Sequence, residues 1–328
     1  MSDQPDIIDI AGLDRGDSAA LTRVARAIAA PCAEWGVFHV VGHGIPAAEL
    51  ARFEDAMRRL FDLPSAEKEA LRRTRDNAWG WYDAELTKNR RDWKEVFDYG
   101  VERDPGAPVP AHSDGLNRWP AARPELRAAL LAHYQHCERI SRALVHALCA
   151  GLALPPDAID GAFDDHTSFQ RLNRYAPCPD PALPDASLLP ERGRLAVHHH
   201  TDAGAVTVLW QDQHAGLQVQ RGEELVLIEP VPGALTVNLG DMLQVWSNDH
   251  YRSPIHRVVA SADHTRHSAP FFWNPSYQTE CAPLPALLRG GERARYRPVS
   301  WARFRDQRSA GDYADYGAEI QISDFAIA

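Results

Sequence analysis

The sequence has little that indicates a membrane, secreted or nucleic-acid-binding protein. No apolar run approaches the roughly 18 residues that a membrane-spanning helix requires. The first residues, Met1-Ser2-Asp3-Gln4-Pro5-Asp6, lack the basic and apolar regions of a signal peptide. The 35 Lys and Arg against 45 Asp and Glu give a net charge of −10, which disfavours polyanions because nucleic-acid affinity depends on neutralised phosphates. We therefore expect a cytoplasmic protein with no nucleic-acid and no membrane partner.

Cysteine is also scarce, and its pattern excludes a disulfide framework or a zinc site. The 328-residue chain has five cysteines, an odd number, with no C-x-x-C pair. Hydrophobic residues make up 45% of the chain, so it can bury a substantial core and needs no disulfide bonds for stability. We expect reduced thiols at Cys32, Cys137, Cys149, Cys178 and Cys281.

Helical periodicity dominates residues 1–165. Apolar side chains recur at helical spacing from Ser18 to Trp35, although Pro31 removes the hydrogen bond to the Ala27 carbonyl and predicts a kink or break there. The short apolar run Val37 to Val41 ends in turn residues and predicts a strand. Further helices are predicted over residues 47–61, 65–73 and 124–150, with a connecting loop from Asp104 to Pro124.

After about Thr167 the apolar period changes from 3.6 to 2, which indicates strands. Many short strands at close spacing favour a sandwich or jelly roll, so we predict a mainly β fold with α elements. In this reading, residues 1–165 form a helix-rich region packed outside a β core of residues 166–328, in one integrated unit. The predicted strands span residues 168–175, 196–201, 205–211, 216–220, 224–230, 234–239, 243–246 and 256–259, and helices return at 283–288 and 301–307.

A candidate metal site begins with His200 and Asp202, an H-x-D triplet at an expected strand end. Residues two apart on a strand share one face, so both side chains can point at one ion. His256, on another predicted strand, is the candidate third ligand. Two imidazoles and one carboxylate leave coordination positions open, which is the arrangement of non-haem Fe(II) oxygenases. A second triplet, His112-Ser113-Asp114, lies in a Pro- and Gly-rich loop, and we expect it to bind no metal because ligands need a rigid support.

Arg266 and Ser268 form a candidate carboxylate clamp ten residues after His256. They lie two apart on an expected strand and share a face. A guanidinium binds a carboxylate through two parallel hydrogen bonds, and a hydroxyl can add a third. An isolated R-x-S is more often a surface arginine on a strand.

Taken together, motifs along nearly the whole chain resemble the isopenicillin-N-synthase-like branch of the Fe(II)/2-oxoglutarate-dependent dioxygenases. The motifs are specific for this superfamily and not for a substrate. They include Cys32-Ala33-Glu34-Trp35-Gly36-Val37-Phe38-His39-Val40-Val41-Gly42-His43-Gly44-Ile45-Pro46, Asp92-Trp93-Lys94-Glu95, Arg171-Leu172-Asn173-Arg174-Tyr175, His200-Thr201-Asp202, His256-Arg257-Val258-Val259 and Arg266-His267-Ser268.

The resemblance implies a double-stranded β-helix, or jelly roll, flanked by N-terminal and C-terminal helices. It implies that His200, Asp202 and His256 hold Fe(II). Arg266 and Ser268 would hold the distal carboxylate of 2-oxoglutarate, with Asn173 and Tyr175 contributing around this co-substrate. Phe272 would lie against the primary substrate.

The implied activity is that of an oxidoreductase of secondary metabolism. Such an enzyme uses O₂ and 2-oxoglutarate to hydroxylate, desaturate or cyclise a small molecule, or to epoxidise it, with release of succinate and CO₂. Retention of Asp202 argues against a halogenase, because halogenating relatives lack this carboxylate. Two alternatives stay open: an Fe(II) oxidase of the same branch that uses no 2-oxoglutarate, and a non-catalytic jelly-roll binding protein.

Two further features allow both a functional and a structural interpretation. His198 lies two residues before His200 and is a candidate contact near the metal or the substrate, although a structural histidine is favoured because the strand moves it about 6.6 Å away. Trp79 and Trp81 flank Gly80 near the expected pocket, either in a mobile flap or, as we favour, as core aromatics. The sequence assigns Lys88, Arg90, Arg91 and Arg171 to no substrate group.

Overall fold

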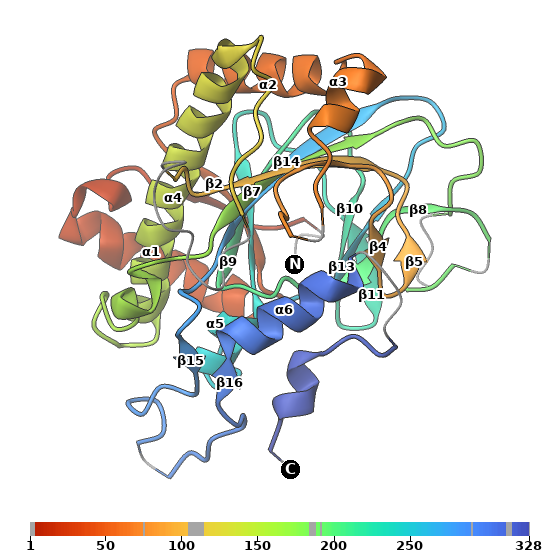
Figure 1. Ribbon diagram of the computed structural model, residues 1–328. Coiled ribbons are helices and arrows are strands. Elements are labelled where there is room, and N and C mark those ends of the chain that lie inside the picture. The colour runs from red at the N-terminus through yellow and green to blue at the C-terminus, as the bar shows by residue number, and fades with distance from the viewer. Residues whose placement is uncertain are drawn as a thin grey trace.

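The computed structural model describes residues 4–74, 76–103, 115–183, 188–190, 192–289, 291–312 and 317–327. Two β-sheets lie at the centre, with most of the helices to one side of them and one helix across the front in the view of Figure 1. None of the helices in the described ranges has the length and apolarity needed to cross a membrane.

The larger sheet combines strands from both halves of the chain. Its eight strands run in the order β1-β2-β12-β9-β14-β7-β6-β3. Four of them come from the half that was expected to be helical, so this half contributes to the sheet as well as covering it. The members are β1 (Ile7–Asp9), β2 (Val37–Val41), β3 (Gly80–Tyr82), β6 (Glu95–Gly100), β7 (Phe169–Tyr175), β9 (Val206–Gln211), β12 (Leu235–Leu239) and β14 (Arg266–Trp273).

The smaller sheet has the order β11-β10-β13-β8, with strands β8 (Leu195–His200), β10 (Leu217–Arg221), β11 (Glu224–Leu227) and β13 (His256–Val259). Apolar residues of both sheets pack in one cluster, which includes Leu209 and Tyr175 from the larger sheet and Val197 and Val258 from the smaller. Apart from the parallel pair of β1 and β2, all strand pairs in the two sheets are antiparallel, and two such sheets packed in this way form the core of a jelly roll. Two short hairpin-like pairs lie outside them, β4 (Leu86–Thr87) with β5 (Arg90–Arg91) and β15 (Glu280–Cys281) with β16 (Val299–Ser300).

The helices cover the larger sheet and close one end of the core. Helix α4 packs against α1 and α2 and also against β9 and β14, so its long apolar face forms the main core with that sheet. Figure 1 shows α6 crossing in front of the sheets. The helices are α1 (Ser18–Glu34), α2 (Ala47–Phe61), α3 (Ser65–Ala70), α4 (Pro124–Gly151), α5 (Asp241–Trp246) and α6 (Trp301–Gly311), with 3₁₀ turns at Leu13–Arg15, Asp160–Phe163 and Ile322–Phe325.

The mainly β fold with a jelly-roll core is confirmed, but three local predictions are wrong. The strand expected over 243–246 is the helix α5, because the Asp241 and Met242 amides bond to the carbonyls of Asp202 and Gly204 and begin a helix. The helix expected over 283–288 is a series of turns, since Pro285 within it has no amide hydrogen. The break expected from Pro31 does not occur, because this residue lies in the last turn of α1, where little of the helix follows.

Candidate metal centre

The structure brings His200, Asp202 and His256 together between the two sheets. His200 ends β8 and His256 begins β13, and these residues are directly paired in the antiparallel ladder. Asp202 follows two residues after β8 ends. One ligand atom from each residue lies within 4.8 Å of the others, and Oδ1 of Asp202 is 3.7 Å from Nε2 of both histidines. These atoms can therefore reach one ion.

Backbone carbonyls fix the orientation of both imidazoles. Nδ1 of His200 donates to the carbonyl of His198 at 2.8 Å, and Nδ1 of His256 donates to the carbonyl of Pro254 at 3.1 Å. A proton on Nδ1 leaves Nε2 with a lone pair, which is the form that binds a metal. Burial, reinforced by His256, lowers the pKa of His200 to about 3, so this ring is neutral at physiological pH.

Asp202 is held by two residues that the sequence analysis did not single out. Oδ2 accepts hydrogen bonds from the Thr207 hydroxyl at 2.5 Å and from Nδ2 of Asn238 at 2.7 Å, so Oδ1 stays directed at the histidines. Burial alone would raise the pKa of Asp202, but His256, His200 and these hydrogen bonds outweigh it and lower the pKa. The carboxylate is therefore ionised. Thr207 and Asn238 come from β9 and β12, and only the register of the sheet places them here.

An inner cavity extends from the three residues to Arg266 and Ser268 on β14. Arg266 is 3% exposed. Its Nε donates to the His214 carbonyl at 3.0 Å, and its Nη2 donates to Oε1 of Gln211 at 2.9 Å. The ring of Tyr175 lies under the guanidinium at 5.1 Å. Nη1 is buried and has no hydrogen-bond partner among the described residues, so this wall of the cavity offers a charged donor to an anion.

Ser268, Tyr175 and Asn173 meet beside this arginine. The Ser268 hydroxyl lies 3.2 Å from the Tyr175 hydroxyl and 3.4 Å from Nδ2 of Asn173, which follows from the pairing of β14 with β7. All three line the inner cavity. Two buried imidazoles with one carboxylate fit a divalent iron, and the unpaired guanidinium donor fits a carboxylate of a co-substrate.

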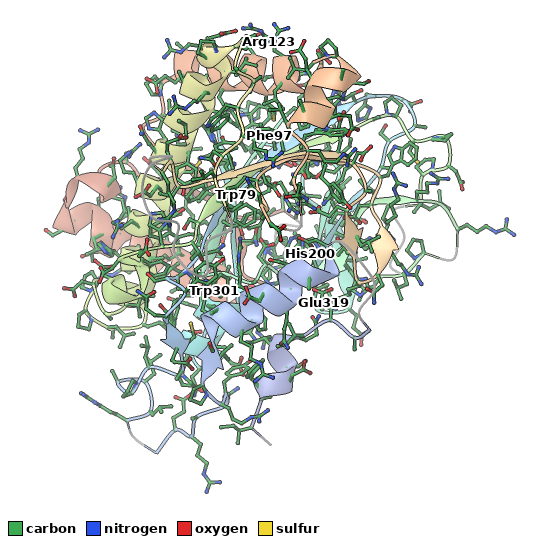
Figure 2. All side chains as sticks on the ribbon, in the orientation of Figure 1. Trp79, Phe97, Arg123, His200, Trp301 and Glu319 are labelled. Atoms are coloured by element: carbon green, nitrogen blue, oxygen red, sulfur yellow. The ribbon has the colours of Figure 1, made fainter. Side chains whose placement is uncertain are left out.

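An outer cavity opens on the other side of His200 and Asp202. Its aromatic residues form a row in which Phe169 is stacked on Phe272 at 4.6 Å and Trp79 lies 5.6 Å from Phe169. Phe272 lines both cavities. Figure 2 shows His200 near the middle of the molecule with Trp79 and Glu319, which also line the outer cavity, close to it in the view.

Trp79 and Trp81 are both buried, as the favoured interpretation expected. Gly80 between them adopts φ 123°, and a Cβ there would lie 2.1 Å from the Leu71 carbonyl oxygen, so only glycine fits. Trp81 donates through Nε1 to Oε2 of Glu95 at 2.7 Å. Trp79 is in addition a wall of the outer cavity.

The charged residues of the outer cavity are largely paired with one another. Arg171 donates to both oxygens of Asp98 and to Glu85 at 2.8–2.9 Å, so its guanidinium is already hydrogen-bonded within the protein. Arg90 and Arg91 are exposed on β5 and do not line this cavity, and Lys88 lies in the turn between β4 and β5. Arg305 from α6, which no motif had indicated, lines the cavity with its guanidinium 4.8 Å from the Phe169 ring.

Asp312, in the wall of the outer cavity, supports a prediction about stability. Burial and then repulsion by Glu85 raise its pKa from 3.8 to about 7, although Arg171 lies 3.9 Å away. Unfolded Asp312 ionises first as the pH rises, so the folded state loses stability between about pH 4 and pH 7. We expect Asp312→Asn to raise the melting temperature by a margin that is absent near pH 4 and largest above pH 7. Thermal unfolding of both proteins across this range measures it, and a pH-independent difference would contradict the assignment.

The remaining histidines of the sequence analysis have different outcomes. The side chain of His198 is held by Asp92, with Nδ1 2.9 Å from Oδ1 of this buried carboxylate, while its carbonyl accepts the hydrogen bond from His200. The second triplet, His112-Ser113-Asp114, lies outside the described residues. Lys94 lines both cavities. It belongs to the motif Asp92-Trp93-Lys94-Glu95, for which the sequence had suggested no role.

Comparisons with known proteins agree with this geometry. A model of the 2OG-Fe(II) oxygenase superfamily matches residues 166–275. A model described as non-haem dioxygenase in morphine synthesis N-terminal matches residues 6–122.

Individual relatives cover most of the chain. Jasmonate-induced oxygenase 4 of Arabidopsis thaliana is 30% identical over 309 residues, which span 91% of this chain and 81% of the relative. Flavonol synthase/flavanone 3-hydroxylase of the same plant is 31% identical over 281 residues, or 85% of this chain and 80% of the relative. The crystal structure of JOX2 in complex with 2OG, Fe and JA superposes with a TM-score of 0.80 at 26% identity, covering 99% of this chain and 90% of that one.

Proposed function

The chain belongs to the 2OG-Fe(II) oxygenase superfamily, and on that premise we propose which of its residues carry the chemistry. It is a dioxygenase that uses Fe(II), O₂ and 2-oxoglutarate to oxidise a small molecule, as the sequence predicted. The observation that supports the assignment of residues is the pair of cavities that meet at His200 and Asp202.

His200, Asp202 and His256 would hold the iron. The two Nε2 atoms and Oδ1 of Asp202 are the atoms that converge, and each is oriented by a hydrogen bond at the other end of its side chain. The bound iron supplies the activation of O₂, which is coupled to conversion of 2-oxoglutarate to succinate and CO₂ and to oxidation of the substrate. The protein positions the reactants and keeps water away from them.

2-Oxoglutarate would lie in the inner cavity with its distal carboxylate on Arg266 and Ser268. Nη1 of Arg266 supplies the charged donor that has no partner, and the Ser268 hydroxyl supplies a second donor. Asn173 and Tyr175 hold the Ser268 hydroxyl in place. The other end of the co-substrate would then extend toward His200 and Asp202, which line the same cavity.

The primary substrate would occupy the outer cavity, against Phe169 and Phe272. Stacked aromatic rings favour a substrate with a flat or apolar body, and the paired charges around them leave room for a few polar contacts. A screen of amino acids, peptides, terpenoid acids and flavonoids for succinate formation tests this assignment. We expect stimulation by at least one compound, and only when 2-oxoglutarate is present.

Phe272→Ala is expected to weaken substrate binding and coupling while leaving iron affinity unchanged. Phe272 is half-buried, and complete burial of a phenylalanine side chain is worth about 1.5–3 kcal/mol, so losing the part that the substrate covers should lower substrate affinity by up to about tenfold. The ratio of oxidised product to succinate should fall as well, because a loosely bound substrate is not always in position when 2-oxoglutarate is converted to succinate. Parallel assays of both products measure the ratio. Phe325→Ala, which removes a half-buried ring outside both cavities, is the control. Unchanged affinity and coupling in Phe272→Ala would exclude the role.

The two alternatives left open by the sequence are now disfavoured. The JOX2 structure contains both 2OG and Fe, and the relatives that cover the chain are named as oxygenases, which opposes a non-catalytic binding protein. An oxidase that uses no 2-oxoglutarate would need Arg266 for its primary substrate, but Arg266 lines the inner cavity and not the outer cavity with its row of aromatic rings.

We further propose that residues 1–165 and 166–328 act as one catalytic unit in secondary metabolism. Strands β2 and β6 from the first region pair with β12 and β7 from the second, which supports the single unit. One relative is named for flavonol synthesis, which supports the metabolic role. All five cysteines are buried and free, which is typical of a reducing compartment such as the cytoplasm.

A further inference from the structure

The strand that carries His200, β8, lies at the edge of its sheet. A segment from the first half of the chain, Asp92 and Trp93, covers this edge. Among the described residues, β8 is the terminal strand of the smaller sheet and pairs with β13 alone, through an irregular register. Edge strands expose backbone groups that need other partners. The Trp93 amide donates to the Leu195 carbonyl at 3.1 Å, and Oδ1 of Asp92 accepts the His198 amide at 3.0 Å. Asp92 and Trp93 thus replace the missing neighbouring strand.

Asp92 is fully buried, and its carboxylate is saturated with donors. Oδ1 accepts from the His198 amide and lies 2.9 Å from Nδ1 of the same histidine. Oδ2 accepts from the Thr87 hydroxyl at 2.7 Å and pairs with Nζ of Lys94 at 3.2 Å. An ionised side chain with this many partners is fixed in one rotamer, and it fixes His198 in turn.

The residue fixed in this way directly supports His200. The carbonyl of His198 accepts the Nδ1 hydrogen of His200 at 2.8 Å, so the plane of the His198 peptide sets the direction of the His200 ring. We propose that Asp92 is a positioning residue that acts through the His198 main chain to orient His200 for metal binding. The proposal rests on the proposed function, in which His200 holds the iron.

The buried charge of Asp92 also connects the metal centre with the substrate side. Lys94 pairs with both Asp92 and Glu85, at 3.2 Å and 2.6 Å, and its side chain lines both cavities. Glu85 pairs in turn with Arg171 in the outer cavity. A buried ionic network is no net source of stability compared with apolar packing, because desolvation of the charges is costly. Its contribution here is the fixed geometry between β8 and the cavity walls.

The test is metal affinity of the full chain after removal of iron with a chelator. We expect Asp92→Asn to bind Co(II) or Cu(II) about 10–100-fold more weakly than wild type, the range typical for residues that orient a ligand. An amide nitrogen cannot accept a hydrogen bond, so the variant leaves either His198 or the Thr87 and Lys94 pair without an acceptor. The d–d spectrum of bound Co(II) or the electron paramagnetic resonance spectrum of bound Cu(II) should also shift.

Glu95→Gln is the matched control. Glu95 belongs to the same segment and also loses an ion pair, with Lys68 at 2.8 Å, but its side chain bonds to Lys68, Trp81 and Arg174 and not to β8. This variant should keep the wild-type metal affinity within about twofold even where its melting temperature falls. Thr87→Val, which removes a single donor to Asp92, provides a milder second variant and should weaken metal binding severalfold.

Two results would overturn the proposal. One is wild-type metal affinity and spectra in folded Asp92→Asn, or in Thr87→Val if the first variant does not fold. The other is an equal loss of affinity in Glu95→Gln, which would indicate a general loss of stability. His200→Ala separates this inference from the proposed function. If His200→Ala binds metal as tightly as wild type does, the assignment of the metal site is wrong. If His200→Ala loses metal affinity but Asp92→Asn does not, only the role of Asp92 is rejected.

Discussion

Alanine in place of Asp202 is expected to abolish turnover and to weaken Fe(II) binding by more than about 100-fold, beyond the effect of residues that only orient a ligand. Oδ1 of Asp202 is the one anionic atom among the three that converge, and it lies 3.7 Å from each histidine Nε2. Without it, two imidazoles would have to bind the cation alone. Anaerobic Fe(II) titration and succinate formation measure the two losses.

Stability has to be followed in the same variant. Asp202→Ala leaves the Thr207 hydroxyl and the Asn238 amide without their shared acceptor, which costs about 1–3 kcal/mol for an unsatisfied buried group. A melting curve of the metal-free protein separates this cost from lost metal binding. His200→Ala and His256→Ala should lose iron and turnover in the same way. His112→Ala removes the histidine of the second H-x-D triplet and should behave as wild type. Iron loss in His112→Ala, with iron retained in Asp202→Ala, would refute the assignment.

Arg266→Gln is expected to weaken 2-oxoglutarate binding by roughly 30-fold to several-thousand-fold. The change leaves the distal carboxylate desolvated and largely unpaired, at a cost of about 2–5 kcal/mol, and about 1.4 kcal/mol corresponds to a factor of ten. The structure gives the reason why this arginine has a free donor. His214 and Gln211 hold Nε and Nη2, so the guanidinium cannot rotate and Nη1 is left for the ligand. The apparent 2-oxoglutarate affinity is measured from succinate formation at saturating iron.

Ser268→Ala should have a smaller effect, about 1.5–3 kcal/mol, because it removes one hydrogen bond to a charged group. Neither variant should change iron affinity. Arg174→Gln is the matched control: Arg174 lies between Asn173 and Tyr175 on β7 but points away from the inner cavity, toward Phe61 and Glu95. Wild-type 2-oxoglutarate affinity in Arg266→Gln would exclude the clamp. Substrate oxidation without 2-oxoglutarate would reassign Arg266 to the primary substrate.

The three residues that the sequence proposed as metal ligands lie together in the structure, whereas some of the predicted local elements are wrong. His200 and Asp202 are recognisable because the two-residue spacing follows a strand pattern and because the R-x-S motif follows at a suitable distance. By contrast, residues 243–246 are apolar except for Gln244, and a short, mostly apolar run is compatible with a strand or a buried helix. The helix forms here because the amides of Asp241 and Met242 donate to the carbonyls of Asp202 and Gly204, which are far away in the sequence.

The outer cavity was hardly predictable. Its walls come from Trp79, Phe169, Phe272 and Arg305, on segments that are spread over most of the chain. Arg171 illustrates the difficulty: the sequence could not decide whether it binds a substrate anion, and the structure pairs it with Asp98 and Glu85. Charged residues pair with whichever opposite charge the fold brings near, and a linear pattern carries no information about that choice.

The sequence by itself indicated the reaction class, because its short motifs around His200, His256 and Arg266 resemble those of one superfamily. Only the tertiary structure decided what supports those residues. Thr207 and Asn238 orient Asp202 through hydrogen bonds, and Asp92 accepts a hydrogen bond from the edge strand β8. These contacts join segments that are far apart in the chain. The physical reason is that hydrogen-bond geometry depends on sheet register and strand order, which local periodicity does not specify.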